Sequence, residues 1–163
     1  MTVDEFEDHG MFRMDDDDIH QTLSTAATGI LGLPAESAPC LRPLSYWFDG
    51  DSRLYFVYVL GSDSRKVTLS ERADAARFLV YKVHRTFNWQ SVLLTGTIER
   101  VPEDERAAIE EELDLSWRPE LFEQDPGPVD TGLYRFEITD RSGVKQLERQ
   151  LDFGAESSAP TEK

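Results

Sequence analysis

The sequence contains a single cysteine, Cys40, among its 163 residues. One cysteine cannot form a disulfide within the chain, and it cannot supply a metal site built from several thiolates. No apolar run approaches the roughly 20 residues that a membrane-spanning helix needs. The acidic N-terminus also lacks the basic and apolar regions of a secretory signal peptide. We therefore expect a cytoplasmic protein that has no contact with a membrane.

Basic residues are scarce as well. Lys and Arg together number 17 against 32 Asp and Glu, which gives a formal net charge of −15. This charge disfavours binding to nucleic acids and to anionic lipid surfaces, so neither is expected as a partner. Carboxylates spread along the whole chain, combined with very few lysines, favour an origin in a salt-loving (halophilic) organism. An ordinary acidic protein with a solvated surface is the alternative.

Several catalytic signatures are missing. The chain has no glycine-rich nucleotide loop, no His-Glu-x-x-His motif and no Gly-x-Ser-x-Gly motif. Its three histidines, His9, His20 and His84, are scattered, so no metal site is predicted. We interpret His84 as a solvent-facing residue at the end of a strand, with haem ligation as the alternative. No side chain is identified as a general acid or base, and catalytic residues stay unassigned.

What the chain does contain is a series of short β-prone segments with few helices between them. The dipeptide Asp49-Gly50 is a strong hairpin signal, and the acidic run at 15–18 favours a helix N-terminus. The pattern predicts strands at 28–33, 40–48, 53–59, 76–83, 90–101 and 132–140, with a further strand within 143–151. It predicts helices at 15–27, 64–75 and 102–113. Residues 1–14 are expected to be a flexible segment, residues 15–150 one domain and residues 151–163 a disordered tail.

Antiparallel neighbours of this kind suggest a mainly β fold, a closed or split barrel decorated with short helices. The segment SDSRKV places two cations, Arg65 and Lys66, in the first turn of a predicted helix, where positive charge is unfavourable. If Ser64 caps that helix, the first amide groups and the two cations form a cradle for a dianion such as phosphate. The alternative is that both cations pair with nearby carboxylates such as Asp63 or Glu71.

From Asp15 to Asp140 the chain resembles the FMN-binding split-barrel proteins related to pyridoxamine-phosphate oxidase, especially their small nitroimidazole-resistance-like branch. The resemblance rests on the order and spacing of ATGILGL, RPLSYW, VLGSDSRK and NWQSVLLTG. It implies a six-stranded antiparallel split β-barrel, a homodimer with two FMN sites at its interface, and flavin-dependent oxidoreduction of a small-molecule substrate. The alternative is a non-catalytic module on the same barrel that binds or stores flavin, haem or a deazaflavin.

The resemblance also implies which residues would contact the cofactor. The strand matching RPLSYW lines the flavin ring in this family, which corresponds here to Arg42, Pro43, Leu44 and Ser45. The segment matching VLGSDSRK wraps the ribityl chain and phosphate, which corresponds to Val59, Leu60, Ser64, Arg65 and Lys66. The strand matching NWQSVLLTG contacts the ring, with Ser91 as the first candidate and Gln90 as the second.

Three further interpretations concern aromatic and charged residues. Trp47 and Trp89 are candidates for walls of the ring site, with ordinary core packing as the alternative. Asp63 departs from the family pattern because its carboxylate would repel a phosphate. The C-terminal part does not match the substrate-binding segment of full pyridoxamine-phosphate oxidases, so oxidation of that vitamer is not expected. Arg135 is interpreted as a member of a surface ion pair.

Overall fold

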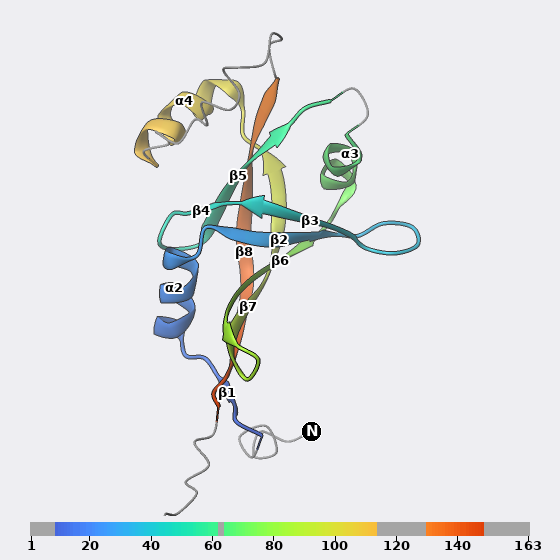
Figure 1. The fold of residues 1–163 in the computed structure, drawn as a ribbon. Coiled ribbons are helices and arrows are strands. Elements are labelled where there is room, and N and C mark those ends of the chain that lie inside the picture. The colour runs from blue at the N-terminus through green and yellow to red at the C-terminus, as the bar shows by residue number, and fades with distance from the viewer. Residues whose placement is uncertain (1–8, 62–63, 114–129, 149–163) are drawn as a thin grey trace, which may run out of the picture.

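The computed structural model describes residues 9–61, 64–113 and 130–148 (Figure 1). Its helices are α2 (Asp16–Thr25), α3 (Arg65–Arg72) and α4 (Glu103–Glu112). Its strands are β1 (Met11–Arg13), β2 (Thr28–Leu33), β3 (Cys40–Ser45), β4 (Trp47–Phe48), β5 (Arg53–Val59), β6 (Ala76–Arg85), β7 (Asn88–Arg100) and β8 (Thr131–Gln146). Within these ranges, no helix combines the length and apolar character that crossing a bilayer would take.

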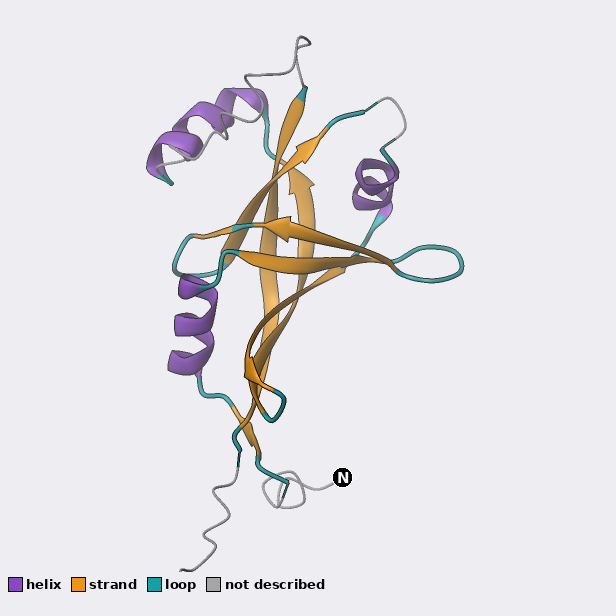
Figure 2. Cartoon of the chain, in the orientation of Figure 1, coloured by secondary structure: helices purple, strands orange, loops and turns teal. Residues whose placement is uncertain are grey.

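The strands form one antiparallel sheet that curls back on itself. The order along it is β3-β2-β6-β7-β8-β5-β4, with β1 added beside β8. The two ends of this path, β3 and β4, are consecutive in the chain and separated only by Tyr46. No ladder joins β3 to β5 in the part of the chain that the structure describes, so the barrel is split there. Strands dominate and the helices lie around the margin (Figure 2), which confirms the predicted fold class.

The described residues form eight strands where the sequence predicted six and a further one, because β1 was not predicted and β4 was not separated from β3. Met11–Arg13, inside the segment expected to be flexible, pairs with β8 as β1. The segment predicted as one strand over 40–48 breaks at Tyr46, whose ring turns into the core. Residues 1–8 and the expected tail at 151–163 lie outside the described residues.

The break at Tyr46 changes the predicted hairpin. Only Trp47 and Phe48 pair with β5, whereas β3 pairs along its whole length with β2. The turn itself is as predicted: Gly50 has a φ of +88°, and the Asp49 carboxylate accepts hydrogen bonds from three amides that follow it. The hairpin therefore exists, but it is two residue pairs deep.

Two other predictions gave wrong strand boundaries, one in β8 and one between β6 and β7. The segments 132–140 and 143–151, predicted as separate strands, are the single 16-residue strand β8. This strand stays continuous because it pairs with β5 over one half and with β7 over most of its length. The segment HRTFNW, predicted to connect two strands, belongs mostly to β6 and β7, which leaves a short turn between Arg85 and Asn88.

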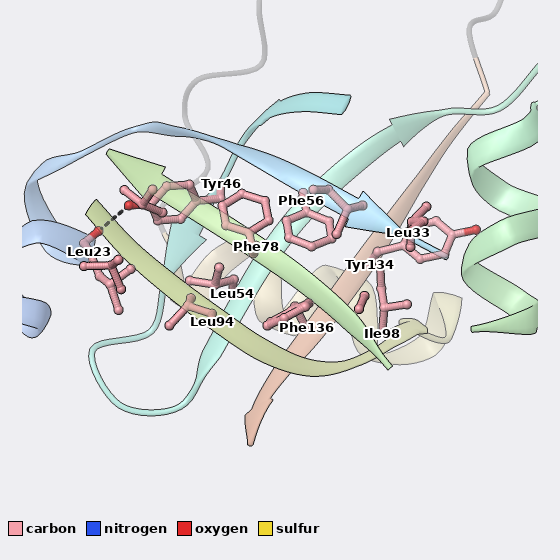
Figure 3. Packing of buried hydrophobic residues seen from close by; sticks show 14 of the residues in the cluster. Leu23, Leu33, Tyr46, Leu54, Phe56, Phe78, Leu94, Ile98, Tyr134 and Phe136 are labelled. Carbon is pink, nitrogen blue, oxygen red and sulfur yellow. Dashed lines mark hydrogen bonds between the residues drawn. The ribbon is translucent and has the colours of Figure 1, made fainter. Parts of the chain in front are cut away.

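The interior of the barrel is aromatic. Phe56, Phe78 and Phe136 are fully buried and contact one another (Figure 3). The hydroxyl of buried Tyr46 donates a 2.8 Å hydrogen bond to the carbonyl of Leu23, which ties α2 to the barrel where the two ends of the sheet meet. Helix α2 begins as predicted, because the Asp15 side chain accepts from the Asp18 amide at 2.8 Å.

Candidate functional site

Helix α3 starts without a side-chain cap. Ser64 occupies the N-cap position as predicted, but its hydroxyl makes no capping hydrogen bond. The first amide groups of a helix have no partner within the helix, so those of α3 stay available to an external acceptor. Arg65 is exposed and Lys66 half-buried in this first turn. The N-terminus of α3 therefore offers uncapped amides and two cations together.

Among the described residues, no carboxylate pairs with Lys66. Its Nζ sits 4.7 Å from the centre of the Tyr58 ring. Burial, and then the positive charge of Arg42, lower the pKa of the Lys66 ammonium below its ordinary value. Within the described residues, neither Arg65 nor Lys66 forms an ion pair, and Glu71 pairs with neither. Asp63, the other carboxylate proposed as a partner, lies outside the described residues.

Tyr58 and Ser70 form a platform against Lys66: the Tyr58 ring faces its ammonium, and Ser70 binds its backbone carbonyl. The Ser70 hydroxyl donates to the Lys66 carbonyl at 2.7 Å, so the Tyr58 hydroxyl is the donor in its 3.0 Å contact with Ser70 Oγ. The Tyr58 ring stacks on Tyr134 with 4.1 Å between centroids. Sequence reasoning missed this platform, although its signals were present: Tyr58 faces inward in the alternating strand LYFVYV, and Ser70 follows Lys66 by one helical turn.

Strand β3 brings a third cation to the same place. Arg42 pairs in register with buried Leu31 and so faces the interior side of the sheet, at its open edge. It is close enough to Lys66 to lower the pKa of that amine. Leu44 lies on the same side and packs on the core. Pro43 and Ser45 face the opposite, outer side and are exposed. Val59 is 45% exposed, and Leu60 is held by the bond from its amide to the Asp130 carbonyl.

The predicted ring contacts on β7 lie elsewhere. Trp89, Gln90 and Ser91 follow the β6–β7 turn, which Figure 1 shows toward the lower end of the barrel, whereas α3 lies toward the upper end. Gln90 is already engaged, because its Nε2 donates to Thr22 Oγ1 of α2 at 3.2 Å. Ser91 is half-exposed on the outer face, opposite Tyr81. A single chain therefore does not bring these residues to Arg65 and Lys66.

Packing and exposure bear on the remaining predictions for Trp47 and His84. Trp47 lies against the second hydrophobic cluster, formed by Tyr55, Val101 and Leu133, so core packing is the correct alternative for it. His84 is exposed where the β6–β7 register shifts. The described ranges contain no group of three or more metal-ligating side chains. Arg135 donates to Glu99, which confirms its predicted ion pair.

Residues 15–145 match the family model of pyridoxamine 5'-phosphate oxidase. No curated protein matches the chain. A FAD-binding protein from Mesorhizobium loti is 18% identical with a TM-score of 0.70, covering 84% of this chain and 99% of the other. A 5-nitroimidazole antibiotic resistance protein from Bacteroides thetaiotaomicron is 13% identical with a TM-score of 0.60, covering 83% and 87%. The FAD and haem binding protein from Mycobacterium smegmatis is 15% identical with a TM-score of 0.62, covering 86% and 74%.

Proposed function

The chain belongs to the pyridoxamine 5'-phosphate oxidase family, and on that premise we propose that it is an FMN-dependent oxidoreductase acting on a small molecule. The observation that carries this proposal is the group of three cations at one end of the barrel, Arg42, Arg65 and Lys66. None of them pairs with a carboxylate in the described residues, although acidic residues outnumber basic ones by 32 to 17.

This end of the barrel fits a phosphate ester. Arg65 presents a planar guanidinium, Lys66 a compact ammonium, and the uncapped first turn of α3 presents backbone amides. The Tyr58 ring lies beside the Lys66 ammonium, with 4.7 Å between Nζ and the ring centroid. A dianion at this point would offset the repulsion between Arg42 and Lys66 and the unfavourable placement of cations at a helix N-terminus.

The neighbouring surface fits the flat ring of the cofactor. The open edge of β3 carries backbone groups without a ladder partner in the described residues, and Leu44 offers apolar contact beside it. When bound, FMN supplies the hydride or electron transfer. The chain's own residues bind the phosphate, orient the ring and exclude water from one side of it.

The site is proposed to be completed by a second copy of the chain. The phosphate-binding group and the group at Trp89–Ser91 lie apart within one chain, and exposed apolar side chains surround the latter: Tyr81 is 50% exposed, Val83 62% and Phe87 60%. A twofold dimer would cover this surface and place Ser91 of one copy near the cations of the other. Light scattering should give twice the chain mass; a monomer that binds flavin would exclude this arrangement.

The visible spectrum of the purified protein tests the cofactor, and rapid mixing with NADH or NADPH tests turnover. An oxidised flavin spectrum that bleaches on mixing and returns with an acceptor supports the oxidoreductase. A flavin spectrum that never bleaches supports the non-catalytic binding module. A haem Soret band would show that the bound cofactor is haem rather than FMN, and a deazaflavin spectrum would show that it is a deazaflavin. Comparing FMN with FAD by titration then decides between the two flavins.

A further inference from the structure

A second surface of the barrel is hollowed and remains unexplained by the flavin site. A groove of about 600 Å³ lies on the outer face of β2, β3, β6 and β7, within the range of small-molecule sites. Register defines two rows across this face, because directly paired residues point to the same side. One row is Leu41–Gly32–Arg77–Thr95 and the next is Pro43–Ile30–Leu79–Leu93.

Gly32 makes the hollow. It stands between Leu41 and Arg77, where every other position of the row carries a side chain. A Cβ at Gly32 would lie 3.5 Å from Leu41 Cδ2 and 3.7 Å from the Arg77 carbonyl, which is ordinary van der Waals contact. A side chain at this position would therefore fit the fold and occupy part of the groove, so the groove is deeper here because the residue is glycine.

The lining has one charged group in an otherwise apolar surface. Arg77 is exposed and forms no ion pair or side-chain hydrogen bond within the described residues, and Thr95 lies directly beside it on β7. The rest of the lining is apolar and includes Leu41, Leu79 and Leu93. The complementary molecule has an apolar body and a single anionic group that a guanidinium can hold in a bidentate contact.

Beyond the groove, the outer face of β6 and β7 continues toward the proposed ring contacts. Along β6 and β7 the outer-face pairs run in the order Arg77–Thr95, Leu79–Leu93 and Tyr81–Ser91. Four residues of strand separate the first pair from the last, about 13 Å. A molecule whose anionic group lies at Arg77 would thus extend its apolar body toward Ser91.

We propose that this groove binds a small apolar carboxylate and that such carboxylates are the substrates of the flavin site. The assignment as substrate rests on the proposed function. The probes are 4-phenylbutyrate and 4-phenyl-1-butanol, which share an apolar body and differ in the carboxylate. Calorimetric titration of the purified protein should show the carboxylate binding about tenfold more tightly than the alcohol, as expected for one charge-assisted contact at an exposed site.

Two variants and a control make the test specific. Arg77→Gln should remove the preference for the carboxylate while leaving the alcohol within about twofold. Gly32→Val should weaken both compounds at least tenfold, because it fills the hollow. Arg85→Gln, which removes an exposed cation farther along β6, should change neither.

The proposal is overturned if neither compound binds, if Arg77→Gln weakens both equally, or if Gly32→Val has no effect. It is also overturned if light scattering shows Gly32→Val converting a dimer into monomers, because the groove would then be covered by a second copy. FMN titration of the same proteins separates this outcome from the proposed function. A wild type that binds phenylbutyrate but not FMN would leave the groove in place and remove its link to flavin.

Discussion

Cations in two regions of this molecule have opposite surroundings. On β5, β8 and α4, three arginines meet acids: Arg53 pairs with Glu137, Arg135 with Glu99 and Arg106 with Glu110. At α3 and β3, Arg42, Arg65 and Lys66 have no acidic partner in the described residues. Since carboxylates are in large excess, the difference is not a shortage of partners. The contrast supports the proposal that the cations at α3 bind an anion that is not part of the chain.

The largest effect on stability is expected from removing Arg106, one of the arginines that pair with an acid. Arg106 donates to Glu110 at 2.7 Å and to the carbonyl and hydroxyl of Thr131 at 2.7 and 2.9 Å, and its side chain is only 19% exposed. Arg106→Ala should lower the free energy of unfolding by about 2–3 kcal/mol in urea titrations. Arg65→Ala, the matched control among the unpaired cations, should change it by less than about 0.5 kcal/mol. Equal losses in the two variants would erase the contrast.

The stability contributed by Tyr58, in the platform beside Lys66, should depend on pH in the alkaline range. Burial raises the pKa of the Tyr58 hydroxyl above its ordinary value of 10.0. The stability that this group contributes is therefore complete below about pH 10, and it is lost as pH rises further, when the unfolded phenol ionises first. Tyr58→Phe should cost about 1 kcal/mol at pH 7 through the lost bond to Ser70. The gap to wild type should shrink above pH 10; a gap that widens there would contradict this account.

Salt tests the repulsion on which the comparison depends. A net charge of −15 destabilises the folded chain at low ionic strength. The thermal midpoint should rise from dilute buffer to molar KCl by about 3 °C for each kcal/mol of repulsion removed. The halophile interpretation predicts this rise to continue into the molar range. A flat or falling profile would favour the alternative interpretation, an ordinary acidic protein with a solvated surface.

The smallest effect concerns Lys66 in the flavin-free protein. Lys66→Met keeps an apolar stem over Tyr58 and removes a cation from a helix N-terminus, so it should raise stability by a few tenths of a kcal/mol at pH 7. The folded pKa of Lys66 is lowered, so its charge is unfavourable to folding at neutral pH, and the penalty is relieved as pH rises toward the unfolded value near 10.5. The advantage of Met should therefore fade with rising pH. A loss of stability at pH 7 would show that Lys66 has a partner.

Local chemistry made much of the fold predictable. The Asp15 cap, the Asp49-Gly50 turn and the two cations of α3 are read from neighbouring residues, and each has the predicted place. The break at Tyr46 was not readable, because it depends on a hydrogen bond to Leu23 that is 23 residues away in the chain. The continuity of β8 was also hidden, since it depends on two partner strands rather than on its own composition.

In the candidate site too, features set by neighbouring residues were predictable, and features set by distant contacts were not. The cations at Arg65 and Lys66 follow from a short segment, whereas the engagement of Gln90 by Thr22 joins residues 68 positions apart. The proximity of Arg42 to Lys66 likewise joins residues of two separate elements, β3 and α3. Sequence spacing could name these residues, but it could not say which of them share one end of the barrel.

FMN and riboflavin binding test the central claim most directly, because the two flavins differ only in the phosphate. Wild type, the Arg65→Ala/Lys66→Ala double variant and an Arg72→Ala/Arg85→Ala control of equal net charge would each be titrated with both. The double variant should lose about two to four powers of ten in FMN affinity, from two charge-assisted contacts, while riboflavin affinity stays nearly constant and the control behaves as wild type. Equal FMN affinity in all three proteins would contradict the account.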